Sequence, residues 1–141
     1  VGGVNTNAHF AFNTILITNG SYAAYVYYWN YNNGTKGKLV FRNNIVASLS
    51  VTKNVAYLSG NTDAFSNAGN NCYFNAKWNY QSSGDVTGNP AFKSLSYPYD
   101  LHLTKGSACA DKGSLDVPGV THDFDGDLRS ESPDIGADEF K

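Results

Sequence analysis

Methionine is absent from this chain of 141 residues, and no apolar run approaches the ~20 residues that a membrane-spanning helix needs. Charged residues make up only 16% of the sequence, and no basic stripe with interleaved aromatic residues points to nucleic acid. Membrane insertion and nucleic-acid binding are therefore not predicted. Because the chain begins with neither methionine nor a signal peptide, we expect it to be a processed product or a piece of a longer protein.

Helix signals are also missing, since no window sustains apolar residues at the i, i+3, i+4, i+7 spacing. The chain instead holds seventeen Asn residues and is rich in Gly, Ser, Thr and Tyr. These residues suit turns and short strands better than helices. The composition therefore predicts an all-β protein, and its polarity from amides and hydroxyls is typical of extracellular proteins.

Cysteine occurs only at Cys72 and Cys109. A disulfide between them closes a loop of about 38 residues and adds roughly 3–4 kcal/mol of stability in an oxidising compartment. The alternative is a pair of buried free thiols. The secreted character of the composition favours the disulfide.

Short apolar or alternating runs recur between residues 9 and 74, each bounded by Asn, Gly or Ser as strands are. Three of them share one pattern: FNTIL (12–16), RNNIV (42–46) and GNNCY (69–73). Their first asparagines, Asn13, Asn43 and Asn70, are 30 and 27 residues apart. A repeat of this length predicts a β-solenoid in which these asparagines form a ladder. The alternative is three unrelated turns.

The character of the sequence changes at Asn89, where single apolar anchors with Pro and Gly replace the repeats, followed by an Asp-rich stretch. We therefore predict one domain with β-solenoid coils over 1–88 and an irregular capping region over 89–141. A cap is needed because the last coil of a solenoid otherwise leaves its apolar interior open.

The capping region contains five motif blocks in a fixed order: NPAF (89–92), DLHL (100–103), GSACADKG (106–113), DFDGDLR (123–129) and DIGADE (134–139). With the upstream Asn repeats, they resemble the C-terminal portion of secreted bacterial right-handed parallel β-helix proteins, the pectate-lyase-like superfold. The resemblance implies a right-handed parallel β-helix of about three to four coils plus an irregular cap. It also implies an architectural role for the cap residues Asp123, Asp125, Gly126, Arg129, Asp134, Gly136 and Glu139, with Arg129 paired to Asp134 or Glu139.

The spacing of Asp123, Asp125 and Asp127 has two interpretations. Oxygen ligands at i, i+2, i+4 can begin a calcium loop, but the pattern lacks the Glu and the Gly placement of an EF-hand. A structural turn is the favoured interpretation, and no other cofactor is predicted. His9, His102 and His122 have no spacing typical of a zinc site, so we predict a structural role for each, with His102 pointing outward from a short strand.

The stretch YAAYVYYWNY (22–31) places Tyr25, Tyr27, Trp29 and Tyr31 on one face of an extended segment. The small residues Ala24 and Val26 suit a narrow interior, so the aromatic face is predicted to point outward. Sugar rings stack on such a surface while hydroxyl and indole groups donate hydrogen bonds. Two alternatives stay open: the aromatic face packs beneath a covering segment, or it contacts another protein.

These features predict an extracellular or cell-surface module that recognises polysaccharide through its aromatic and amide-rich face. The first alternative is a structural module that self-associates through the open N-terminal coil or the aromatic face, as in a filament, adhesin or tailspike. The second is a polysaccharide lyase or glycoside hydrolase. Asn61-Thr62-Asp63 resembles one block of polygalacturonase-like hydrolases, but the other carboxylates that such chemistry needs are missing. No catalytic residue is predicted, and enzyme activity is the weakest alternative.

Overall fold

The computed structural model describes residues 7–28, 38–50, 52–60 and 65–141, and these residues contain strands but no helix. No helix in these ranges is long and apolar enough to cross a membrane. The all-β prediction is confirmed for this part of the chain. The strands are β1 (Ala8–Ala11), β2 (Thr14–Ile17), β3 (Tyr22–Tyr28), β4 (Leu39–Arg42), β5 (Ile45–Ser48), β6 (Lys53–Gly60), β7 (Phe65–Gly69), β8 (Cys72–Phe74), β9 (Ala76–Lys77), β10 (Val86–Thr87), β11 (Phe92–Ser94) and β12 (Asp100–Leu103).

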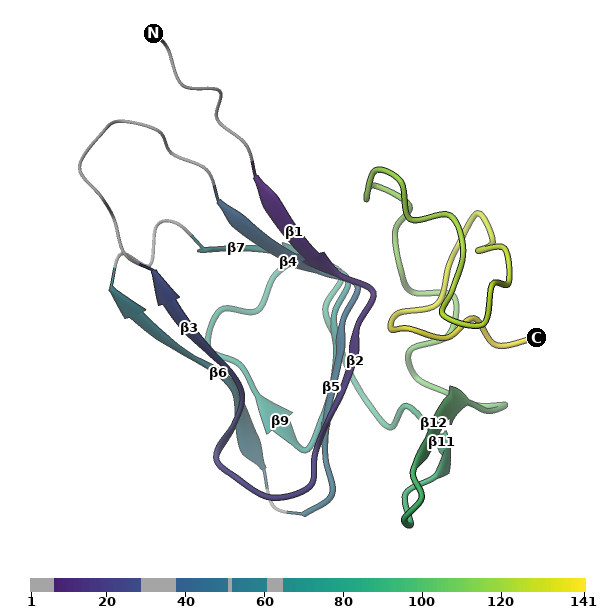
Figure 1. Ribbon diagram of the computed structural model, residues 1–141, viewed down its shortest axis with the longest axis horizontal. Helices are drawn as coiled ribbons and strands as arrows, with labels where there is room; N and C mark the ends of the chain where they lie inside the picture. Colours follow the sequence, from purple (N-terminus) through teal and green to yellow (C-terminus); the bar gives the residue numbers. More distant parts are fainter. Residues whose placement is uncertain (1–6, 29–37, 51, 61–64) are drawn as a thin grey trace, which may run out of the picture.

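The first nine strands form three successive units of three strands each. Every strand pairs in parallel with its counterpart in the next unit, which gives the sheet orders β1-β4-β7, β10-β8-β5-β2 and β3-β6-β9. Figure 1 shows the units lying one behind another, with the three sheets around a common interior. Parallel strands need a crossover connection, and here the other two strands of each unit provide it.

The corner between the first and second strand of each unit has a left-handed backbone. Phe12, Asn43 and Asn70 have φ values of 55°, 54° and 57°. Asparagine tolerates this conformation better than most residues, so two of the three corners follow local preference. At the remaining corner, in the first unit, the Phe12 ring is buried and the Arg129 guanidinium carbon lies 4.1 Å from the ring centroid.

The asparagine ladder is shifted by one residue from the predicted set in two of the three units. Asn13 Nδ2 donates to Asn44 Oδ1 at 2.9 Å, and Asn44 Nδ2 lies 3.2 Å from Asn71 Oδ1. The ladder ends on Asp85, whose Oδ1 accepts from Asn71 Nδ2 at 3.1 Å. The shift arises because Thr14 pairs with Ile45, which pairs with Cys72, so the residues before them align.

The predicted ladder members Asn43 and Asn70 instead reach the C-terminal region. Asn43 exchanges two hydrogen bonds with Ser114, at 2.7 and 3.0 Å, and Asn70 Nδ2 donates to the Lys112 carbonyl at 2.9 Å. A left-handed corner points these side chains away from the stacked units. They therefore attach residues 112–114 to the units rather than the units to one another.

Apolar side chains form two clusters, one on each face of the β2-β5-β8-β10 sheet. Val46 and Tyr73 belong to the interior cluster, and their neighbours Ile45 and Cys72 belong to the outer one. Because β5 is covered on both faces, its residues form a continuous buried run. The outer cluster also contains Leu103, Cys109 and Ile135 from the C-terminal region, which lies beside this sheet in Figure 1.

The region over 89–141 therefore packs against the side of the units, whereas the prediction placed it over the last unit. A different segment contacts that end. Asn67 of β7 donates to the Tyr80 carbonyl and to Asp85, and the Trp78 ring packs edge-on against Phe65 at 5.5 Å. Residues 78–85 thus cover β7, the last strand of its sheet.

The cysteines join the two parts of the chain. Cys72 of β8 and Cys109 of the C-terminal region form a disulfide with a Cα–Cα distance of 5.8 Å. Both are fully buried in the outer cluster.

Gly136 lies close to the same sheet, because a Cβ there would be 2.6 Å from Ile45 Cδ1. Its φ of 105° also favours glycine.

Candidate functional site

An antiparallel hairpin of β11 and β12 forms one side of the candidate site. Phe92 pairs with Leu103 and Ser94 with Asp100. Side chains alternate along a strand, so Leu103 enters the outer core while His102 faces the other way and stays half-buried. Asp100 and His102 therefore share one face of β12.

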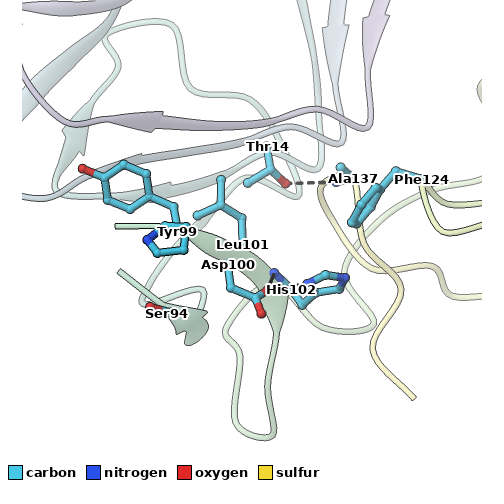
Figure 2. A pocket seen from close by; sticks show the side chains of 9 residues that line it. Thr14, Ser94, Tyr99, Asp100, Leu101, His102, Phe124 and Ala137 are labelled. Atoms are coloured by element: carbon cyan, nitrogen blue, oxygen red, sulfur yellow. Dashed lines mark hydrogen bonds and ion pairs between the residues drawn. The ribbon is translucent and has the colours of Figure 1, made fainter. Parts of the chain in front are cut away.

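A cleft of about 650 Å³ lies between this hairpin, the C-terminal loops and β2. Figure 2 shows Thr14, Ala137 and Phe124 along one side of it, with Asp100 and His102 of β12 opposite them. Thr14 Oγ1 accepts a hydrogen bond from Ala137 N at 3.0 Å, which joins β2 to the C-terminal loop at the cleft. The cleft is lined by Thr14, Ser94, Pro98, Tyr99, Asp100, Leu101, His102, Phe124 and Ala137.

Exposed aromatic rings border the cleft on two sides. Phe124 is 61% exposed and its ring centroid lies 5.1 Å from that of His102. Tyr99 is 42% exposed and packs edge-on against the more exposed Tyr97 at 6.0 Å. Large apolar surfaces beside convergent polar groups are typical of sites that bind small molecules and sugars.

His102 lies between two carboxylates. Its Nδ1 contacts Asp100 Oδ1, and its Nε2 lies 2.9 Å from Asp125 Oδ2. The hydrogen bonds to Asp100 and then to Asp125 raise the pKa of His102, and the bond to His102 lowers the pKa of Asp100. Lys93 Nζ, 3.4 Å from Asp100 Oδ2, favours the charged carboxylate further.

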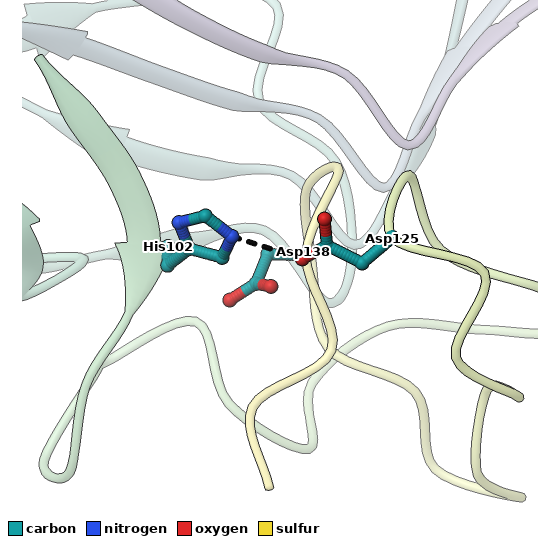
Figure 3. A group of neighbouring side chains, drawn as sticks. All are labelled: His102, Asp125 and Asp138. Atoms are coloured by element: carbon teal, nitrogen blue, oxygen red, sulfur yellow. Dashed lines mark hydrogen bonds and ion pairs between the residues drawn. The ribbon is translucent and has the colours of Figure 1, made fainter.

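A third carboxylate, Asp138, approaches the same imidazole from the C-terminal stretch. It is buried, and its Oδ2 accepts a hydrogen bond from Leu103 N at 2.6 Å. Burial raises the pKa of Asp138. One ligand atom from each of His102, Asp125 and Asp138 lies within 4.8 Å of the other two (Figure 3). A nitrogen and two carboxylates at this separation can hold a divalent cation.

The predicted cap residues are brought together around Arg129, whose side chain is almost completely buried. Its guanidinium donates to the Gly136 carbonyl at 2.9 Å and to the Ala137 carbonyl at 3.1 Å, and it lies 3.4 Å from Glu139 Oε2. Of the two predicted partners, Glu139 contributes its carboxylate and Asp134 its backbone carbonyl at 3.4 Å. Arg129 thus links the ends of the last two motif blocks.

The three aspartates weighed as calcium ligands face different partners. The Asp123 carboxylate accepts hydrogen bonds from the backbone N–H groups of Asp125, Asp127 and Glu139 at 2.8–3.0 Å, and these bonds lower its pKa despite its burial. Asp127 pairs with Lys141 at 2.7 Å, and Asp125 faces His102. Gly126, with φ 88°, makes the turn between them. Asp125 thus joins a different group of candidate ligands from the predicted one.

The aromatic face of 22–31 is described only in part. Tyr25 and Tyr27 lie in β3, where their backbones pair with Tyr57 and Ser59 of β6, but the structure does not describe their side chains. Trp29, Tyr31 and the Asn61-Thr62-Asp63 block lie outside the described residues. The outward aromatic face therefore stays a prediction.

No protein-family model matches this chain, and no curated protein matches it either. The site must therefore be interpreted from its own geometry. The sequence does not indicate that His102, Asp125 and Asp138 meet, because 23 residues separate the first two and 13 the last two. The one local signal was Asp100-Leu101-His102, since residues at i and i+2 of a strand share a face.

Proposed function

We propose that this chain is a right-handed parallel β-helix module that binds polysaccharide outside the cell. The parallel return of each strand to its own sheet supports the β-helix assignment, as does the buried Asn ladder between units. The disulfide between Cys72 and Cys109 supports an oxidising, extracellular location.

The observation that carries the binding proposal is the cleft beside β12. Tyr99 and Phe124 present exposed rings for the C–H faces of a sugar, while the Asp100 carboxylate between them keeps lone pairs that can accept hydrogen bonds from hydroxyl groups. Such a combination of flat apolar surface and charged acceptors suits a ligand covered with hydroxyls. The aromatic face of 22–31 is a second proposed contact of the same kind.

Binding is proposed rather than catalysis because the polar groups of the cleft already have partners. The Asp100 carboxylate is shared between His102 and Lys93, and Asp125 is held by His102. A glycoside hydrolase needs one carboxylic acid and one carboxylate poised for the glycosidic bond. A lyase or hydrolase accordingly stays the weakest alternative.

Self-association is the second candidate, and the strand order favours it. β1, β2 and β3 each have one parallel neighbour among the described strands, and all three lie at the same end of the units. Such edges expose backbone N–H and C=O groups that a second chain can pair with. This candidate predicts multimers in sedimentation experiments whether or not sugar is present.

A glycan-array screen tests the proposed function. We expect selective binding by the wild type and affinity at least about tenfold weaker, equivalent to ~1.4 kcal/mol, in Tyr99→Ala and Phe124→Ala. The matched control is Tyr80→Ala, because Tyr80 is 51% exposed and does not line the cleft.

The variants that lose binding show which surface contacts the sugar. Loss of binding in Trp29→Ala alone would move the site to the 22–31 face. Absence of binding by the wild type across a broad array, or binding that both cleft variants retain together with Trp29→Ala, would contradict the proposal.

A further inference from the structure

Three segments far apart in the chain converge on one point beside the cleft. His102 comes from β12, Asp125 from the Asp-rich turn and Asp138 from the C-terminal stretch. Figure 3 shows the Asp138 carboxylate next to the contact between the His102 ring and Asp125. Hairpin packing, the turn at Gly126 and the Arg129 network all have to be in place for this convergence.

The imidazole of His102 is held in the orientation that a metal ligand requires. Asp100 contacts Nδ1 and also accepts the backbone N–H of His102 at 3.2 Å, so the ring is fixed relative to β12. A carboxylate on one ring nitrogen sets the tautomer and raises the basicity of the other nitrogen. Here the other nitrogen, Nε2, points toward Asp125 and Asp138.

Asp138 supplies an independent observation. Its exposed fraction is 6%, and within the described chain its one hydrogen-bond donor is Leu103 N, on Oδ2. The second carboxylate oxygen accepts no hydrogen bond from the described residues and is reached by solvent, so its lone pairs are open to an ion. Burial of a charge is costly unless a cation or further donors compensate it. A bound cation would provide that compensation.

We propose that His102 Nε2 and the carboxylates of Asp125 and Asp138 bind a divalent transition metal ion, with Zn²⁺ as the best match. A nitrogen ligand favours Zn²⁺ over the oxygen-preferring Ca²⁺ and Mg²⁺. Three protein ligands leave a fourth tetrahedral position open, and the cleft lined by His102 and Phe124 gives water or a ligand access to it.

Binding of the ion requires the three ligand atoms, which lie within 4.8 Å of one another, to adjust their separations. Ligand atoms of tetrahedral Zn²⁺ lie about 3.3–3.6 Å apart, given bonds of ~2.0–2.2 Å. His102 Nε2 and Asp125 Oδ2 lie 2.9 Å apart, and the Asp125 side chain is 45% exposed and has space to move. Asp138 is buried and held by the hydrogen bond from Leu103 N, so Asp125 is the ligand with more freedom to move when the ion binds.

Calorimetric titration of Zn²⁺ into the metal-stripped full chain tests this proposal. We expect saturable binding of one ion per chain, weakened at least 10–100-fold in His102→Ala and in Asp138→Asn. Asp100→Asn, which perturbs the orienting contact, is expected to weaken binding 10–100-fold. The control is His122→Ala, because His122 is exposed and contacts Thr121 outside the cluster.

Two further measurements keep the outcome clear if a buried variant fails to fold. Asp125→Asn alters an exposed ligand, and NMR spectra of the imidazole groups report which histidine the ion contacts. Addition of Zn²⁺ should shift the His102 ring signals and leave those of His9 and His122 unchanged. The proposal is wrong if no saturable binding occurs, if His102→Ala and Asp125→Asn bind like the wild type, or if His9 or His122 shifts instead. None of these readouts depends on sugar binding.

Discussion

At the scale of single residues, neighbouring asparagines in this chain perform different structural roles. In the Asn43-Asn44 pair, Asn43 adopts the left-handed corner and binds Ser114 outside the units, while Asn44 points inward and joins the ladder. Asn70 and Asn71 repeat this division. One side-chain amide is suited to both roles because it donates and accepts hydrogen bonds and tolerates positive φ.

The ladder predicts a large effect of Asn44→Ala. Asn44 is fully buried, and its side chain donates to the Phe10 and Arg42 carbonyls and accepts from Asn13. Its removal breaks these three hydrogen bonds and leaves a gap at a fully buried position, so the free energy of unfolding should fall by about 2–4 kcal/mol. Urea denaturation measures the change.

A matched substitution separates the ladder from loss of any amide. Asn79 is exposed, and Asn79→Ala should alter the free energy of unfolding by less than about 0.5 kcal/mol. Equal stability of the Asn44→Ala and Asn79→Ala variants would show that the buried ladder contributes nothing to stability.

At the scale of elements, the Asp-rich segment over 123–139 is organised around one cation. Arg129 is the buried guanidinium, and Asp123, Asp134 and Glu139 surround it as buried carboxylates. Backbone N–H groups stabilise each of these carboxylates, as in the bonds of Asp134 with Asp111 N and Phe140 N at 2.7 Å. One guanidinium cannot neutralise three acids, so burial and repulsion from Glu139 raise the pKa of Asp134.

This raised pKa predicts a pH effect that depends on Asp134. Above the ordinary Asp pKa of 3.8, the unfolded chain releases the proton while the folded chain still holds it. The contribution of Asp134 to stability is therefore largest in acid and falls as pH rises through the raised pKa. Urea denaturation of the wild type and Asp134→Asn between about pH 4 and about pH 7 measures this contribution.

The direction in which the stability difference between the two proteins changes with pH tests this prediction. The free energy of unfolding of the wild type minus that of Asp134→Asn should decrease as pH rises over this range. A difference that stays constant or increases would mean that the neighbouring cation and N–H groups outweigh burial at Asp134.

At the scale of the whole molecule, the β2-β5-β8-β10 sheet joins two layers. Its inner face contributes Val46 and Tyr73 to the interior cluster, and its outer face contributes Ile45 and Cys72 to the cluster shared with the C-terminal region. The disulfide crosses that second interface. The cleft lies where the same interface reaches the surface beside Thr14, so its shape depends on how the two layers pack.

Removal of the disulfide should therefore weaken the whole fold. The disulfide joins two residues that are 37 positions apart in the sequence. In the double variant Cys72→Ala/Cys109→Ala, loss of this cross-link should lower the free energy of unfolding by about 4 kcal/mol. Urea denaturation of both proteins under oxidising conditions measures this loss. The double variant is the proper comparison because each single variant leaves one buried thiol unpaired. Unchanged stability would indicate that packing alone holds the C-terminal region to the sheet.

The sequence by itself determined the all-β character of the chain, because turn-forming asparagines and short alternating runs act through local preferences. It also indicated that residues near positions 13, 43 and 70 repeat one structural element. It missed the alignment within that repeat, because consecutive asparagines look alike until strand pairing sets Thr14 against Ile45. A shift of one residue exchanges corner and ladder roles without changing composition.

Only the tertiary structure decided where the C-terminal region packs and which acids meet His102. The region covers the side of a sheet, so that β5 is buried on both faces. The hydrophobic pattern of the strand shows that it is buried but does not show which segment covers it. Asp125 and Asp138 reach His102 because the Arg129 network folds the last residues back on β12. Contacts between residues so distant in sequence carry no local signal, since long-range packing alone brings them together.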